Sequence, residues 1–155
     1  MMDFKAILVA TDFSECAGAA FKVGRNLARS FGAKLILLHV IPQSVLTRVA
    51  EYLKVEPGNL LPEFRQQAQQ RLDGFLKDYG HDGQEVTSMV GVGIPFQEIA
   101  VIARDLAADL IVVGGYGRSG RGPIEEVFFG STAEKVVRLL PCPVLCVPLE
   151  KDEKS

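Results

Sequence analysis

Short apolar runs alternate with longer amphipathic segments along the chain. The runs have the length of β-strands and consist largely of apolar residues; they cover residues 5–11, 34–40, 84–92, 109–114 and 143–147. Because the first two runs are apolar at nearly every position, both of their faces are expected to be buried. Strands of this kind are typical of a parallel sheet that helices cover on each side.

The segments between the runs carry apolar residues at helical spacing. They predict helices over residues 15–31, 45–55 and 62–79, from 93–95 onward, and over 131–139. Ser14 and Gly32 are the residue types that begin and end the first of these helices. We expect Pro62 to be the first residue of the third helix, after a break at residues 57–59.

This alternation predicts an α/β fold, a single domain on a parallel sheet with right-handed crossovers. The length of 155 residues suits one domain and is too small for two of ordinary size. Residues 1–149 are expected to form the domain, and the charged residues 150–155 a frayed tail.

Composition and charge narrow the function. The chain has 17 Lys and Arg against 19 Asp and Glu, a net charge of −2, which argues against a nucleic-acid-binding protein held by bulk charge. Three cysteines without a CxxC pair, and two histidines, argue against a disulfide framework or a multi-histidine metal centre. No apolar stretch reaches the ~20 residues of a membrane span, and the N-terminus lacks the basic region of a signal peptide. We therefore expect a cytoplasmic protein with neither nucleic-acid nor membrane partners.

Few side chains outside the loops suggest chemistry. Cys142 and Cys146 are expected to be buried free thiols. His39 is expected to pack under the sheet edge, because no nucleophile or carboxylate can be assigned to it. No catalytic triad, acid pair or metal cluster is recognisable, so fast catalysis is not expected.

A glycine-rich loop directly after the fourth run carries the strongest signal for ligand binding. Six glycines fall between Gly114 and Gly130. Glycine lets backbone N–H groups approach a ligand closely, and the N-terminus of the following helix adds donors, so the loop is suited to phosphate. It matches neither of two regular phosphate motifs. Its GxGxxG follows the fourth strand and lacks the later acid, and Pro123 stands where a Walker A loop has lysine.

Several short segments, taken in order, resemble the universal stress protein family over nearly the whole chain. They are ILVATDFS at residues 7–14, LLHV at 37–40, GIP at 93–95, DLIVVGGYGRSG at 109–120, GSTAEKVVR at 130–138 and PCPVLCV at 141–147. The resemblance implies a five-stranded parallel sheet of order 3-2-1-4-5 with helices on both faces. In that order the topology switches between strands 1 and 4, and such sheets bind ligands at the switch point.

One branch of this family binds ATP through the motif Gly-x2-Gly-x9-Gly-Ser/Thr. Gly114 and Gly117 match its first half, and Gly130 with Ser131 matches its second, but twelve residues separate the halves in place of nine. By the resemblance, Asp12 would bind the ribose or approach the phosphates through a metal. The full set of residues implied to bind nucleotide is Thr11, Asp12, Val40, Gly114, Gly117, Arg118, Gly130, Ser131 and Thr132.

Three of these residues also have ordinary structural alternatives. Asp12 could tie the strand–helix turn through its carboxylate. Ser131 could form a capping box with Glu134. Val40, whose backbone would contact adenine by the resemblance, could be a plain strand residue.

The resemblance implies a protein that binds ATP, or AMP or ADP, with or without Mg²⁺. It would act as a sensor or adaptor in a stress response, toward a protein partner that the sequence does not identify, and would be at most a slow ATPase. Two other functions stay open. One is a homodimeric interaction protein without nucleotide. The other is an enzyme of the related adenine-nucleotide α-hydrolase fold, against which the missing catalytic residues speak.

The last apolar run, residues 143–147, lies at the sheet edge in the implied strand order. The segment PVLCV has no charged residue that would oppose strand pairing at that edge, so we expect it to pair with another chain. We expect a homodimer in which two copies of this strand pair antiparallel across a two-fold axis. The resemblance points the same way, because many family members dimerise through the last strand.

Overall fold

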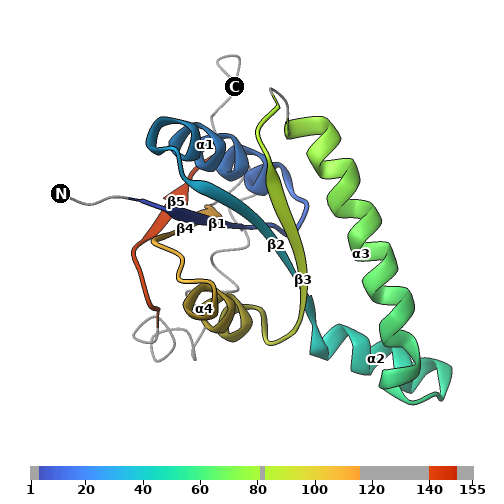
Figure 1. The fold of residues 1–155 in the computed structure, drawn as a ribbon. Helices are drawn as coiled ribbons and strands as arrows, with labels where there is room; N and C mark the ends of the chain where they lie inside the picture. The colour runs from blue at the N-terminus through green and yellow to red at the C-terminus, as the bar shows by residue number, and fades with distance from the viewer. Residues whose placement is uncertain (1–3, 81–82, 116–139, 150–155) are drawn as a thin grey trace.

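The sheet has five strands in the order β3-β2-β1-β4-β5, and every neighbouring pair is parallel. The structure, a computed structural model, describes residues 4–80, 83–115 and 140–149. Its elements are β1 (Ala6–Ala10), α1 (Glu15–Phe31), β2 (Lys34–Pro42), α2 (Gln43–Leu53), α3 (Pro57–Tyr79), β3 (Val86–Gly93), α4 (Pro95–Asp105), β4 (Leu110–Gly114) and β5 (Val144–Val147), as drawn in Figure 1. The α/β fold and the strand order expected from the sequence are therefore confirmed.

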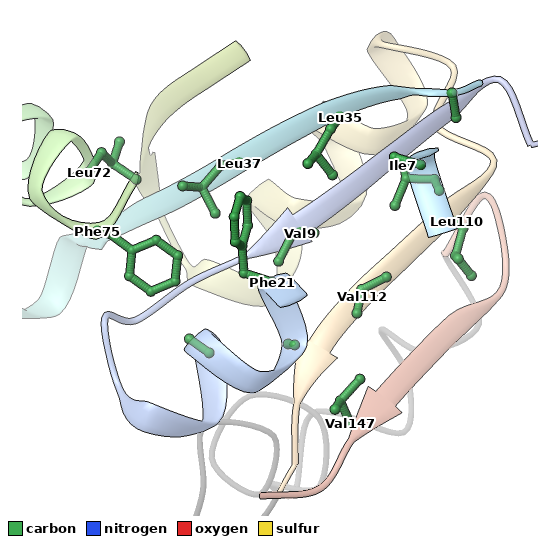
Figure 2. Close-up of a cluster of buried hydrophobic side chains, with 14 residues drawn as sticks. Ile7, Val9, Phe21, Leu35, Leu37, Leu72, Phe75, Leu110, Val112 and Val147 are labelled. Carbon is green, nitrogen blue, oxygen red and sulfur yellow. The ribbon is translucent and has the colours of Figure 1, made fainter. Parts of the chain in front are cut away.

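Alternate residues of the central strands enter two separate cores, because successive strand side chains point to opposite faces. Ile7 and Val9 of β1 pack with α1 and α3 on one face, in the cluster shown in Figure 2. Leu8 of β1 and Ile111 of β4 pack with α4 on the other face. The two-sided burial predicted for the first two apolar runs is thus explained by helices on both faces.

The first helix begins and ends at the predicted residues. Ser14 is its N-cap, and the Ser14 hydroxyl oxygen accepts a hydrogen bond from the Ala17 N–H at 3.2 Å. Gly32 ends the helix with φ of 63°, a left-handed conformation that glycine adopts without steric cost. This cap fixes where α1 starts and therefore the length of the turn between β1 and α1.

The prediction for the start of the third helix was wrong. Pro57 is the first residue of α3, and Pro62 lies inside the helix. Both prolines can occur at a helix start, and the sequence alone does not say which of them does. The Asn59 N–H donates to the Glu56 carbonyl at 3.0 Å, so residues 57–59 form the first turn rather than a break. Proline at position 62 removes one donor from a helix of 23 residues, which the remaining turns tolerate.

The predictions for three polar or thiol side chains also need correction. Cys146 is exposed and Cys142 is half-buried, because both lie at the margin of the sheet on or beside the outer strand β5. His39 does not lie under an edge: β2 is flanked by β1 and β3, and the imidazole is half-buried on an interior strand. The predicted helix over 131–139 falls outside the described residues. Within the described ranges, no helix is both long and apolar enough to cross a membrane.

Candidate functional site

The carboxyl ends of β1 and β4 lie side by side at the point where the sheet topology reverses. Val9 of β1 is in register with Val112 of β4. From β1 the chain proceeds to β2 on one side, and from β4 it proceeds to β5 on the other. Connections that leave in opposite directions make these strand ends a topological switch point, which is where open α/β sheets bind ligands.

The turn after β1 places Asp12 at this switch point. Thr11 is 6% exposed, and the Thr11 hydroxyl oxygen accepts a hydrogen bond from the Phe13 N–H at 2.9 Å. Asp12 is exposed, and its Oδ1 accepts from the Ser14 N–H at 3.0 Å. The Asp12 carboxylate therefore does tie the turn between β1 and α1, which was the structural role considered as an alternative to ligand binding. That bond uses one of its two carboxylate oxygens, so the role does not exclude contact with a ligand.

Gly114, the last residue of β4, lies at the same switch point. A Cβ built on Gly114 would lie 2.7 Å from the carbonyl carbon of Cys16 in the first turn of α1. Any larger residue would push the helix from the strand, so glycine permits this close packing. The Gly115 N–H donates to the Val147 carbonyl at 2.7 Å, which ties the chain after β4 to the end of β5.

The Cys16 thiol lies at a helix N-terminus, a position that often lowers the pKa of cysteine. Here burial raises the pKa of the Cys16 thiol, and the negative charges of Asp12 and Glu15 add to this effect. The thiol therefore stays protonated at neutral pH and is not an activated nucleophile.

An aromatic cluster lies behind the Asp12 turn, and the sequence analysis did not identify it. The Phe13 ring centroid is 4.4 Å from that of His39, and the Arg71 guanidinium carbon of α3 is 4.2 Å from the Phe13 centroid. The His39 Nδ1 is 2.9 Å from the Thr11 carbonyl oxygen. Because a carbonyl can only accept, Nδ1 carries the proton and donates.

His39 is neutral in this environment. Burial lowers the pKa of His39, as does the nearby positive charge of Arg71, and these effects exceed the opposing ones of the Thr11 carbonyl and Asp12. Only one signal in the sequence could have indicated the cluster, an aromatic residue between Asp12 and Ser14 in an otherwise polar turn. Arg71 of α3 lies far from Phe13 along the chain, and no pattern in the sequence indicates that the two are in contact.

The structure therefore brings Thr11, Asp12 and Gly114 to the carboxyl end of the sheet. Val40 lies near the same end of β2, in register with Gly91, and its buried side chain packs on the α4 face. Only its backbone can face a ligand. The other predicted ligand residues lie outside the described residues: Gly117, Arg118, Gly130, Ser131 and Thr132. In the described ranges no three His, Cys, Asp or Glu side chains are grouped so as to hold a metal ion.

A sequence model of the universal stress protein family matches residues 3–148. The chain belongs to the universal stress protein family. Universal stress protein MJ0577 of Methanocaldococcus jannaschii is 33% identical over 93% of this chain and 94% of its own length. Universal stress protein YxiE of Bacillus subtilis is 30% identical over 93% of this chain and 99% of its own.

Solved structures of universal stress proteins share the fold. The structure of MJ0577 aligns with a TM-score of 0.73 at 30% identity, over 97% of this chain and all of the other. Two structures with lower identity contain a nucleotide. One is a universal stress protein in complex with cAMP, with a TM-score of 0.57 at 19% identity over 96% of this chain and all of its own. The other is the universal stress protein from Archaeoglobus fulgidus in complex with dAMP, with a TM-score of 0.61 at 21% identity over 94% of this chain and 99% of its own. At these identities the likeness shows the fold alone.

Proposed function

We propose that this universal stress protein binds an adenine nucleotide at the carboxyl ends of β1 and β4 and acts as a sensor or adaptor in a stress response. One observation carries the proposal: the Asp12 turn and Gly114 meet at the switch point of the sheet. The exposed Asp12 carboxylate at these strand ends offers acceptors to the hydroxyls of a sugar.

The ligands of two related folds support an adenine nucleotide in particular. Universal stress proteins have been solved with cAMP and with dAMP. Both ligands contain adenine and a phosphate, and the glycine-rich segment of this chain follows β4 directly at the same edge. ATP is the ligand that we propose first, because the split glycine motif provides backbone donors for more than one phosphate.

Each predicted residue has a role in this proposal. Asp12 accepts hydrogen bonds from the ribose or binds Mg²⁺ that arrives with the phosphates, and the Val40 backbone contacts adenine. The phosphates lie along Gly117 and Arg118 and along the segment of Gly130, Ser131 and Thr132. In this proposal the protein binds its ligand without rapid turnover.

Titration calorimetry tests this function directly. ATP, ADP, AMP and cAMP are titrated in separate experiments, each with and without Mg²⁺. We expect saturable heat with at least one of them and a rise in melting temperature on its addition. No heat and no thermal shift with any of the four at millimolar concentration would contradict the proposal.

A homodimeric interaction protein is the second candidate, and a difference between the two edge strands of the sheet favours it. Side chains of α3 already bond to the edge strand β3: Arg65 donates to the Val90 carbonyl at 3.1 Å, and Gln69 donates to the Ser88 hydroxyl at 3.2 Å. At the opposite edge, β5 pairs with β4 alone among the described strands, and Leu145 is 37% exposed. We propose that β5 pairs with its copy in a second chain.

The reducing cytoplasm is the compartment we propose for both functions. Cys16, Cys142 and Cys146 are all free thiols in the structure. Three unpaired cysteines suit a reducing compartment better than an oxidising one.

A further inference from the structure

Phe13 has a backbone conformation that its residue type disfavours. Its φ is 69°, in the left-handed region. A Cβ crowds the backbone there, and bulky residues avoid it. Lys54 and Ala107 are the other non-glycine residues with positive φ in the described ranges, and both lie at or just after the end of a helix, where this conformation ends the helix. Phe13 precedes a helix, so that explanation does not apply to it.

The Phe13 ring contacts side chains of two other elements. The Arg71 guanidinium carbon of α3 lies 4.2 Å from its centroid, a distance typical of a cation–π contact. The centroid of the His39 ring of β2 lies 4.4 Å from it, with an interplanar angle of 38°. The Phe75 ring adds an edge contact with centroids 6.3 Å apart. These contacts stabilise the disfavoured backbone conformation, because another φ would turn the ring out of the clamp.

The clamped turn is the one that carries Asp12. The N–H of Phe13 donates to the Thr11 hydroxyl, and the next N–H, of Ser14, donates to the Asp12 carboxylate. The His39 imidazole, itself in the clamp, donates to the Thr11 carbonyl. Rotation about φ of Phe13 would carry the Ser14 N–H away from the Asp12 carboxylate and break the one bond of the turn that spans this dihedral, so the carboxylate would lose the donor that fixes its direction. The three clamp residues lie on β2, on α3 and in the turn that carries Asp12.

We propose that Phe13 and Arg71 are positioning residues of the ligand site, and that the clamp of Arg71, Phe13 and His39 makes ligand affinity depend on helix α3. This inference rests on the proposed function, since it concerns how that site is held ready for its ligand. Neither residue needs to contact the ligand. A site whose turn is already in the binding conformation binds more tightly than one that must order it.

The substitution Arg71→Ala tests the clamp, because Arg71 is exposed and its loss leaves the core intact. We expect the Kd for ATP and the Kd for AMP to rise by the same factor, about fivefold, with only a small fall in melting temperature. Arg71→Lys, which keeps a cation over the ring, should recover most of the affinity. The matched control is Arg65→Ala on the same helix, whose guanidinium contacts the Val90 carbonyl instead, and it should bind like the unaltered chain.

Two results would overturn the inference while the unaltered chain still binds nucleotide. One is equal affinity in Arg71→Ala and Arg65→Ala. The other is a loss confined to ATP, which would mean that Arg71 contacts the outer phosphates directly.

A measurement without ligand separates the clamp from the proposed function. The ring current of Phe13 falls on the His39 imidazole, so the imidazole NMR resonances should shift in Arg71→Ala and return toward their original positions in Arg71→Lys. Unmoved resonances would overturn the clamp even where nucleotide binds. An unaltered chain that binds no nucleotide would overturn the proposed function and, with it, the role of the clamp in affinity.

Discussion

Gly114 at the end of β4 lies against the backbone of Cys16 at the start of α1, so close that a Cβ on Gly114 would stand 2.7 Å from the Cys16 carbonyl carbon and oxygen. Real Cβ atoms do not approach backbone atoms to this distance. The contact joins the last residue of one strand to the helix that follows its neighbour. It therefore sets how far the β1–α1 turn, with Asp12, stands from β4.

Gly114→Ala is expected to separate α1 from β4. Backbone atoms cannot move aside as a flexible side chain does, so the free energy of unfolding should fall by about 1–3 kcal/mol. Nucleotide affinity should fall as well, because Asp12 moves with the helix start. Denaturant unfolding and titration calorimetry measure the two effects.

Gly74→Ala in α3 is the matched control for that substitution. A Cβ at Gly74 would meet nothing within 4 Å. Alanine in an open helix position is expected to raise the free energy of unfolding by about 0.5–1 kcal/mol. If the two glycine variants were equally stable, the packing account of Gly114 would be wrong.

Asp12→Asn should weaken nucleotide binding and leave the fold unchanged. The amide oxygen can still accept from the Ser14 N–H, which Asp12 Oδ1 accepts at 3.0 Å. The lost negative charge removes a ligand for Mg²⁺, so the affinity for ATP should fall more in Mg²⁺ than in its absence. Asp12→Ala loses both features and should in addition melt at a lower temperature. Equal Mg²⁺ dependence in Asp12→Asn and in the unaltered chain would exclude Asp12 from the metal site.

Stability should depend on pH through His39. Burial, aided by Arg71, holds the pKa of His39 below its ordinary value of 6.5. The folded protein therefore binds fewer protons at His39 than the unfolded chain does. The contribution of the neutral imidazole to the free energy of unfolding is fully present above pH 6.5 and is lost as pH falls through the lowered pKa. Urea unfolding at about pH 7.5 and about pH 5 should show a smaller loss of stability in His39→Gln than in the unaltered chain. The same loss in both would show that other groups cause it.

Leu145→Lys should convert a homodimer into a monomer. Leu145 is 37% exposed on β5, whereas Val147 is buried in the core, so Leu145 is the side chain that can be changed without loss of stability. Leu106→Lys is the control, because Leu106 is 38% exposed at the end of α4 and is not part of a strand. Sedimentation equilibrium should show dimers for the unaltered chain and for the control. An unaltered chain that sediments at the monomer mass of 16.9 kDa at tens of micromolar would exclude the β5 dimer.

The fold could be predicted from the sequence where one local signal decides each element. Two apolar faces indicated buried strands, and Ser14 and Gly32 marked the ends of α1. The start of α3 could not be predicted in this way, because Pro57 and Pro62 are equally good first residues. The exposure of Cys146 depends on which strand lies at the edge and on what covers it, neither of which its neighbours in the sequence determine.

The site could be predicted only in part, for a related reason. Asp12 lies two residues after β1 and Gly114 is the last residue of β4, so the strand order alone brings them to the same end of the sheet. The clamp on Phe13 needs Arg71 from the middle of α3. Which turn of a long helix faces a given loop depends on packing angle and register, and these come from the whole core.

An NMR titration of the backbone amides with ATP and Mg²⁺ tests the central claim most directly, because it reports both binding and place. We predict that the shifts concentrate at Thr11, Asp12 and Gly114 and in the first turn of α1. They should be absent from Lys5 and Asp109, which lie joined by a hydrogen bond at the opposite end of the sheet. Saturable shifts at the carboxyl ends of β1 and β4 would support the account. Shifts centred on Lys5 and Asp109, or none at millimolar ATP, would contradict it.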